Sequence, residues 1–185
     1  MRNAQAGVSA FFFVCGCAAF ASIPYLQKVE FEKFQRTEPY FSCPVPLFSR
    51  VAMIRRDASG KGDFGASRGN RNERTHQGVD LLVKVGNPIT ASKSGRVSYA
   101  GIGKGYGWYA ELVHPDGRLS RYAHLSTVEV SQGQWVASGS RIGTAGKSGN
   151  ADDPRMLPHL HFEIRENGKP VNPLGGLMDP TLPVR

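Results

Sequence analysis

The stretch His159–Ile164, which reads HLHFEI, decides the fold. Successive side chains of a β-strand point to opposite faces, so His159, His161 and Glu163 share one face and the apolar residues between them share the other. This alternation indicates a half-buried strand, with a hydrophobic core beneath it and a polar groove above it.

A second stretch, His76–Val83, repeats the pattern with the sequence HQGVDLLV. On a strand, His76, Gly78 and Asp80 share one face, and the apolar residues that alternate with them occupy the other. The i,i+4 spacing of His76 and Asp80 also suits a helix, as in the helical metalloprotease motif. Gly78 and the apolar run after Asp80 favour a strand instead.

The two stretches together hold the residue types of a catalytic zinc site. A catalytic Zn²⁺ takes three protein ligands, often histidine and carboxylate, and keeps a fourth position open for water. The candidates are His76, Asp80, His159 and His161. Strand geometry alone does not decide between His159 and His161 as the third ligand.

The remaining pattern is one of short strands joined by turns, in a chain with 22 glycines and 12 prolines. Pro115-Asp116-Gly117 and Asn167-Gly168 are turn sequences that predict β-hairpins. No amphipathic helical stretch of useful length follows residue 47, and Arg55–Asn72 has the composition of a loop. We therefore predict an all-β fold, mainly antiparallel sheet or sandwich, with long loops and few short helices. The expected strands are Val51–Ile54, Gly78–Val83, Ile89–Ala91, Gly95–Ala100, Trp108–His114, Arg118–Leu125, Trp135–Val136, Ile142–Ala145 and His159–Arg165.

The N-terminus has the layout of an export signal, because Arg2 precedes an apolar run from about Ala6 to Tyr25. Cleavage at Ala19-Phe20-Ala21, lipidation at Cys17 and retention as a membrane anchor are all open. Each outcome places the domain outside the cytoplasm, in the periplasm or cell envelope. We expect a signal or anchor over residues 1–21, a linker over 22–46 and a single catalytic domain over 47–185.

The linker contains a possible amphipathic helix, Gln27–Arg36, and serves best as a spacer from the membrane. The alternative is that Tyr40, Phe41 and Pro44 lie along the groove and restrain access to it. Cys43 is the one cysteine beyond the signal, so no intramolecular disulfide forms in the mature chain, and a half-buried structural thiol is expected.

The formal net charge of +8 favours an anionic partner, such as nucleic acid, anionic lipid or an acidic cell-wall polymer. A solvated basic surface accounts for the charge equally well. No nucleic-acid motif or recurring arginine–aromatic pattern is present, so we expect no nucleic-acid partner.

Three further residues are weighed for a role at the site. His124 lies at the end of an expected strand and is a candidate for proton transfer or oxyanion stabilisation. His114 lies beside the Pro115 turn and is interpreted as structural. Glu163 shares a face with the histidines, where it acts either as a general base or as a carboxylate that orients a ligand.

The motifs resemble those of the lysostaphin-type (LytM-like) zinc endopeptidases. The resemblance covers about Phe64–Pro173 and rests on motifs in the family's order: His76-x-Gly78-x-Asp80, Gly86-x-Pro88, Gly105-x-Gly107, Tyr122-x-His124-Leu125 and His159-Leu160-His161-Phe162-Glu163. Members of that family hydrolyse peptide bonds in bacterial peptidoglycan.

The resemblance implies one zinc ion per chain, with His76, Asp80 and His161 as ligands and His124 and His159 as the catalytic pair. One imidazole of the pair would take a proton from water, and the other would help to stabilise the oxyanion. The expected partner is a peptidoglycan peptide, the chain is expected to be a monomer, and residues 103–107 and 146–158 are expected to form the groove walls.

Two other functions stay open from the sequence. A non-catalytic module that regulates another cell-wall hydrolase is the first, although all five site residues are present. A metal-dependent peptidase that acts on proteins is the second. The loops do not decide between a direct cross-link to a diamino acid and a glycine-containing bridge as the bond cleaved.

Overall fold

The computed structural model describes residues 37–45, 52–68 and 74–181. The expected export signal and the helix at residues 27–36 lie outside these ranges. Tyr40 to Arg185 form one compact unit. Within the described ranges, no helix has the length and apolar character needed to cross a membrane.

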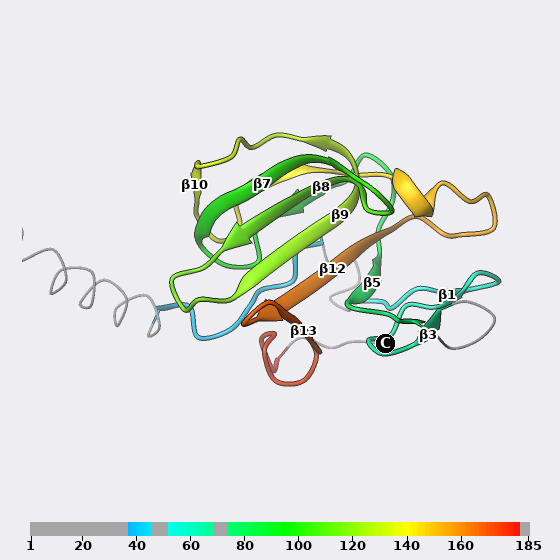
Figure 1. The fold of residues 1–185 in the computed structure, drawn as a ribbon, viewed down its shortest axis with the longest axis horizontal. Helices are drawn as coiled ribbons and strands as arrows, with labels where there is room; N and C mark the ends of the chain where they lie inside the picture. Colours follow the sequence, from blue (N-terminus) through cyan, green and yellow to red (C-terminus); the bar gives the residue numbers. More distant parts are fainter. Residues whose placement is uncertain (1–36, 46–51, 69–73, 182–185) are drawn as a thin grey trace, which may run out of the picture. The chain divides into compact units, whose positions relative to one another are not determined.

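The unit is built almost wholly from antiparallel strands, as predicted (Figure 1). Nine strands form the main sheet, and two short two-stranded ribbons accompany it. The ribbons are β1 (Arg56–Asp57) with β2 (Gly60–Lys61), and β3 (Ser67–Arg68) with β4 (Arg74–Thr75). The sheet strands are β5 (Val79–Leu82), β6 (Pro88–Thr90), β7 (Gly95–Gly103), β8 (Gly107–Val113), β9 (Leu119–Val128), β10 (Trp135–Val136), β11 (Arg141–Ala145), β12 (His159–Glu166) and β13 (Lys169–Val171).

The main sheet branches at β9. The end of β9 pairs with β11, and its first half, residues 119–123, pairs with β12. β12 in turn pairs with β5 along its first half and with β13 along its second half. Figure 1 shows β7, β8, β9 and β12 running side by side, so β12 lies between two strands at the point where its histidines occur.

The alternation read from the sequence assigns the core-facing residues of β5 and β12 correctly, but the strands are not half-buried as expected, because the polar side chains of the opposite face are buried as well. Leu160, Phe162 and Ile164 are fully buried in the core, as are Val79 and Leu81 of the neighbouring strand. Burying such side chains supplies about 1.5–3 kcal/mol each, so these two strands are anchored on their apolar faces.

Both predicted hairpin turns are present. Gly117 has φ 80° between β8 and β9, and Asn167 and Gly168 have φ 50° and 76° between β12 and β13. Two consecutive residues of positive φ match the tight turn that Asn-Gly favours, because it follows the twist of the paired strands.

Two local differences from the sequence analysis concern the N-terminal side of the unit. The Arg55–Asn72 segment, expected as a loop, contains β1, β2 and β3 within its described part. These strands have only two residues each, which is too short for a periodic pattern to show.

The compact unit also begins earlier than the boundary at residue 47 that the sequence suggests. Phe41 is 1% exposed, and its backbone N–H donates to Leu177 O at 2.9 Å. Its ring meets His114 edge-on, with centroids 5.1 Å apart, and Lys93 Nζ lies 5.0 Å from its centre. Phe41 therefore belongs to the core and does not lie along a groove, as the alternative to the spacer required.

We expect Phe41→Ala to lower the free energy of unfolding by about 3 kcal/mol, because it removes a buried ring and leaves a cavity. The matched control is Tyr40→Ala, whose side chain is 45% exposed and which should change stability by about 0.5 kcal/mol or less. Urea unfolding followed by circular dichroism measures both values. Equal effects of the two substitutions would contradict the placement of Phe41 in the core.

Candidate metal centre

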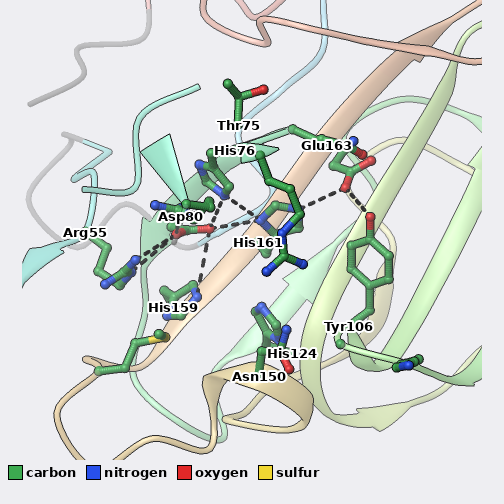
Figure 2. Close-up of a pocket in the computed structure, with 16 residues that line it drawn as sticks. Arg55, Thr75, His76, Asp80, Tyr106, His124, Asn150, His159, His161 and Glu163 are labelled. Atoms are coloured by element: carbon green, nitrogen blue, oxygen red, sulfur yellow. Dashed lines mark hydrogen bonds and ion pairs between the residues drawn. The ribbon is translucent and has the colours of Figure 1, made fainter. Parts of the chain in front are cut away.

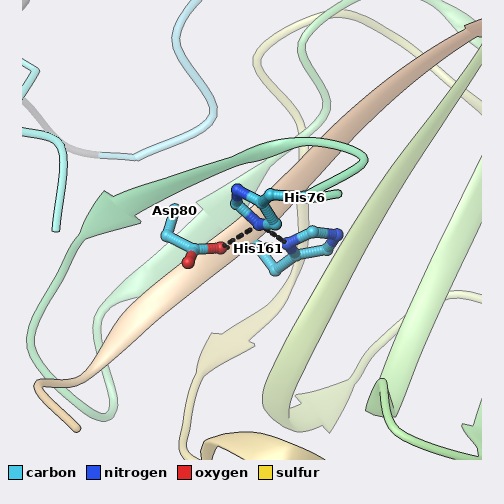
Figure 3. A group of neighbouring side chains, drawn as sticks. All are labelled: His76, Asp80 and His161. Carbon is cyan, nitrogen blue, oxygen red and sulfur yellow. Dashed lines mark hydrogen bonds and ion pairs between the residues drawn. The ribbon is translucent and has the colours of Figure 1, made fainter. Parts of the chain in front are cut away.

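Strand pairing brings the two key stretches of sequence together. The register of β12 against β5 places His161 directly opposite Asp80 and His159 opposite Leu82. His76 lies just before β5, where its backbone N–H donates to the Ala66 carbonyl at 2.8 Å. The side chains of His76, Asp80 and His161 are buried and face one another (Figure 3).

Their donor atoms form a nearly equilateral triangle. His76 Nε2 lies 2.9 Å from Asp80 Oδ1 and 2.9 Å from His161 Nδ1, and the last two atoms are also 2.9 Å apart. In a hydrogen bond one atom donates and the other accepts. Among three atoms that all contact one another, at least one pair must therefore consist of two donors or two acceptors. No placement of protons satisfies this triangle, whereas one cation makes all three atoms ligands.

The hydrogen bond made by the outer nitrogen of each ring sets the tautomer and so directs the lone pair of the inner nitrogen toward Asp80. His76 Nδ1 lies 2.9 Å from the Asp63 carbonyl oxygen, and His161 Nε2 lies 3.0 Å from Glu163 Oε1. Both oxygens only accept, so these two nitrogens donate. The neutral imidazoles then turn His76 Nε2 and His161 Nδ1 toward Asp80 without protons, as metal-binding histidines do.

The donor set suits zinc in chemistry and in size. Two imidazole nitrogens with one carboxylate oxygen are ordinary zinc ligands, whereas magnesium and calcium prefer oxygen alone. Ligands bonded at about 2.0 Å in a tetrahedral site stand about 3.3 Å apart, slightly more than the 2.9 Å separations here. Burial opposes charge on His161, but Asp80 and Glu163 outweigh it and raise the pKa of His161, so a proton competes with a metal for this ring.

Two arginines hold the second oxygen of Asp80. Arg55 donates to Asp80 Oδ2 at 3.1 and 3.3 Å, and Arg68 donates to the same atom at 3.2 Å. Arg55 is buried and also donates to Asp57. Burial opposes ionisation of Asp80, but the facing His161 and His76 lower its pKa below the ordinary range. Neither arginine was predicted as a site residue, since neither belongs to a motif with a characteristic spacing.

Glu163 orients His161 from behind and is itself fully bonded. Its Oε1 accepts from His161 Nε2 and, at 2.8 Å, from the Tyr106 hydroxyl, while its Oε2 accepts from Arg121 at 3.0 Å and Arg165 at 2.7 Å. Burial opposes ionisation, but His161 and Arg121 lower the pKa of Glu163 to about 2. A carboxylate so bonded is a poor proton acceptor, which favours the orienting role over the general base.

Tyr106 is a further site residue that the sequence analysis did not single out. Its ring lies 5.8 Å from that of His161, and Arg121 lies 4.4 Å from the ring centre. Burial, followed by the charge of Glu163, raises the pKa of Tyr106 to about 12, so its hydroxyl stays protonated and donates. Its position inside the Gly105-x-Gly107 motif is the signal that could have identified it.

A β-bulge turns His124 toward the site. Tyr122 pairs with Ala110 and Leu125 pairs with Trp108, so two residues of β9 oppose one residue of β8. His124 adopts φ 63°, a conformation that is uncommon for residues other than glycine and that often marks functional positions. Its Nδ1 donates to the Ser148 carbonyl at 2.8 Å, which leaves Nε2 without a proton.

His159 is held in the same tautomer. Its Nδ1 donates to the Leu157 carbonyl at 2.7 Å, and its Nε2 lies 3.9 Å from Asp80 Oδ1, beyond hydrogen-bond distance. The rings of His124 and His159 are 5.1 Å apart. Burial, aided by the neighbouring His161 and His159, lowers the pKa of His124 to about 3, and burial also lowers that of His159. Both rings are therefore neutral acceptors beside the donor triangle.

All five residues proposed from the sequence line one groove of about 610 Å³ (Figure 2). Its walls include Lys104 and Tyr106 from the turn between β7 and β8, and Asn150 and Met156 from the long loop before β12, in agreement with the expected wall segments. His114 lies elsewhere, with its Nε2 2.8 Å from Ser120 Oγ. Burial raises the pKa of the Cys43 thiol to about 11, as suits a structural residue.

Two glycines of the groove walls, Gly107 and Gly149, lie in close contact. A side-chain carbon at Gly107 would lie 2.5 Å from the nitrogen of Gly149, and one at Gly149 would lie 2.3 Å from the nitrogen of Gly107. Both residues have positive φ. These glycines allow the two wall loops to pack against each other, which shapes the groove.

The chain is therefore a β-sheet protein in which a groove holds a His/Asp/His cluster of the kind that binds a metal ion in metallopeptidases. Residues 74–173 match the model of peptidase family M23. The chain belongs to this family, which confirms the predicted lysostaphin-type resemblance.

Relatives within the family carry different names. Over 112 residues the chain is 42% identical to the murein hydrolase activator NlpD of Escherichia coli, covering 60% of this chain and 27% of that protein. Over 101 residues it is 40% identical to the DD-carboxypeptidase/endopeptidase Mpg of Neisseria gonorrhoeae, covering 55% and 22%. The match spans about a quarter of the length of these curated relatives.

A solved structure of the same architecture is the catalytic domain of the antimicrobial peptidase lysostaphin from Staphylococcus simulans. It superposes with a TM-score of 0.55 and 31% identity, covering 62% of this chain and 88% of that domain. The fold and the arrangement of strands are therefore those of an M23 catalytic domain.

We expect the purified chain to bind one zinc ion, and His76→Ala, Asp80→Ala and His161→Ala each to lose it, because each removes one corner of the triangle. His124→Ala and His159→Ala are the matched controls and should retain most of it. Metal analysis by mass spectrometry, with circular dichroism to verify folding, measures the zinc content. Loss of zinc from His159→Ala with retention in His161→Ala would reverse the assignment.

We expect Glu163→Gln to weaken zinc binding by about 10- to 100-fold, the usual effect of removing a group that orients a metal ligand. Glu166→Gln on the same strand is the control, since Glu166 is exposed and pairs only with Arg118 among the described residues. Competition with a chromogenic chelator measures the affinities. Equal affinities in the two variants would show that Glu163 does not orient His161.

Proposed function

We propose that the chain is a zinc-dependent endopeptidase that hydrolyses peptide bonds in bacterial peptidoglycan, with His76, Asp80 and His161 as zinc ligands. One observation carries the proposal: three inward-facing lone pairs, unsatisfiable by protons, stand in one groove beside His124 and His159. A purely structural cluster gives no reason for two further neutral histidines with free Nε2 atoms at this position.

The remaining chemistry belongs to the chain's own residues. When bound, zinc supplies Lewis acidity, which lowers the pKa of a coordinated water and polarises a carbonyl. His124 and His159 each keep Nδ1 bonded to a backbone carbonyl, so each can receive a proton only at Nε2. One ring takes the proton of the attacking water at its Nε2 and, as the imidazolium, then gives that proton to the leaving amine. The other ring is neutral and has no proton on Nε2, so it accepts a hydrogen bond from the water and orients it.

The names of the relatives support peptidoglycan as the substrate. One relative, 42% identical over 112 residues, is named a murein hydrolase activator, and another, 40% identical over 101 residues, is named a DD-carboxypeptidase/endopeptidase. The export-type N-terminus supports a location in the periplasm or cell envelope, where this polymer lies. A positively charged protein is also retained near an anionic wall.

A second candidate function is activation of another wall hydrolase, without catalysis by this chain. The name of the NlpD relatives favours it. The arrangement of five site residues with tautomers set by hydrogen bonds favours catalysis, because a module that only binds a partner does not need neutral imidazoles in a buried groove.

Digestion of purified peptidoglycan separates the two functions. We expect the zinc-loaded chain to release soluble muropeptides, detected by mass spectrometry, and a chelator or His159→Ala to abolish the release. Failure of the wild-type chain to release fragments, together with faster digestion by an added wall hydrolase that persists for His159→Ala, would overturn catalysis in favour of activation.

A further inference from the structure

The groove around the candidate metal centre carries more positive than negative side chains. Two acids line it, Asp80 and Glu163. Four permanent cations line it as well: Arg55, Arg68, Arg74 and Lys104.

Both acids are already engaged by neighbouring side chains. Asp80 Oδ2 accepts from Arg55 and Arg68, and its Oδ1 belongs to the donor triangle. Glu163 accepts from Arg121 and Arg165 in addition to His161 and Tyr106. Neither carboxylate can therefore serve as the partner of a further cation.

Among the described residues, Arg74 and Lys104 are the two groove cations without an ion-pair partner. Within residues 37–45, 52–68 and 74–181, neither side chain makes an ion pair or a hydrogen bond. Both are exposed at the groove. Arg74 stands directly opposite Arg68 across the β3–β4 ribbon, and like charges in that position repel. An anion between them would remove this repulsion.

The two cations come from different walls. Arg74 precedes Thr75 on β4, and Lys104 lies in the turn that leads to Tyr106. Figure 2 places Thr75 and Tyr106 on different sides of the histidine cluster. An extended ligand that crosses the centre therefore meets a cation from each wall.

We propose that Arg74 and Lys104 form a carboxylate-binding pair that selects acidic wall peptides, with free carboxylates near the scissile bond. A guanidinium and an ammonium both bind carboxylate through charge-assisted hydrogen bonds, and the walls of a groove focus the positive potential. The favoured substrate is a cross-link to a diamino acid that keeps its carboxylate, and an uncharged glycine bridge is disfavoured. This inference rests on the proposed function for its substrate.

Two synthetic cross-linked peptides test the pair, one with free carboxylates and one with the same groups as carboxamides. Rates are measured with the full zinc-loaded chain, with Arg74→Gln and Lys104→Gln, and with Lys169→Gln, an exposed residue of β13, as the control. We expect the wild-type chain to favour the carboxylate peptide by about tenfold, and each groove variant to reduce that ratio by about 3- to 5-fold, as for partly exposed ion pairs.

The reduction should arise from KM for the carboxylate peptide, with the carboxamide peptide and the control variant unaffected, and it should shrink at high salt. Equal cleavage of both peptides by the wild-type chain, or an unchanged ratio in both groove variants, overturns the inference. If neither peptide is cleaved, the proposed activity is contradicted, but the carboxylate-binding pair is not. Binding of the same labelled peptides, measured by fluorescence anisotropy, then tests the pair. A tighter Kd for the carboxylate peptide that depends on Arg74 and Lys104 supports the pair, and equal or absent binding overturns it.

Discussion

The register between β12 and β5 is the constraint on which the site depends. It sets His161 opposite Asp80, and a shift of one residue would turn every side chain of β12 to the other face. The apolar partners on these strands, Leu160 and Phe162 on β12 and Leu81 on β5, are fully buried. Exposing several of them would cost about 1.5–3 kcal/mol each. The packing that forms the core therefore also fixes the donor triangle.

Charged residues around the donor triangle fix the orientation and charge state of its members. Asp80 and Glu163 each bond an imidazole through one oxygen and arginines through the other, so both oxygens of each carboxylate are engaged. The bond from His161 to Glu163 sets the tautomer, and the arginines behind Asp80 keep its charge compensated in a buried position. Removing one partner would leave an uncompensated buried charge, which explains why the network extends well beyond the three donors.

The parts of this arrangement that follow a period or a motif could be predicted from the sequence. Alternation in His159–Ile164 identified the strand and its faces, and Asn167-Gly168 identified the hairpin. Phe41 could not be placed, because one aromatic residue without periodicity gives no sign of the distant strands that bury it. Arg55 could not be recognised either, since its contact with Asp80 spans 25 positions of the chain and arises from the pairing of the segment before β1 with β5, where Ile54 bridges to Leu81.

The charge arrangement links the candidate chemistry to the choice of ligand. Two neutral imidazoles and one carboxylate would leave a bound divalent ion with net positive charge, and the arginines that share Asp80 would weaken that carboxylate as a compensating group. Such an ion would supply the electrophilic centre that the proposed attack on a peptide carbonyl needs. The same excess of positive charge extends outward to the groove walls, because both local acids are already engaged. A peptide that brings its own carboxylates supplies the missing negative charge, so the electrostatics of the centre and the selection of an acidic ligand have one origin.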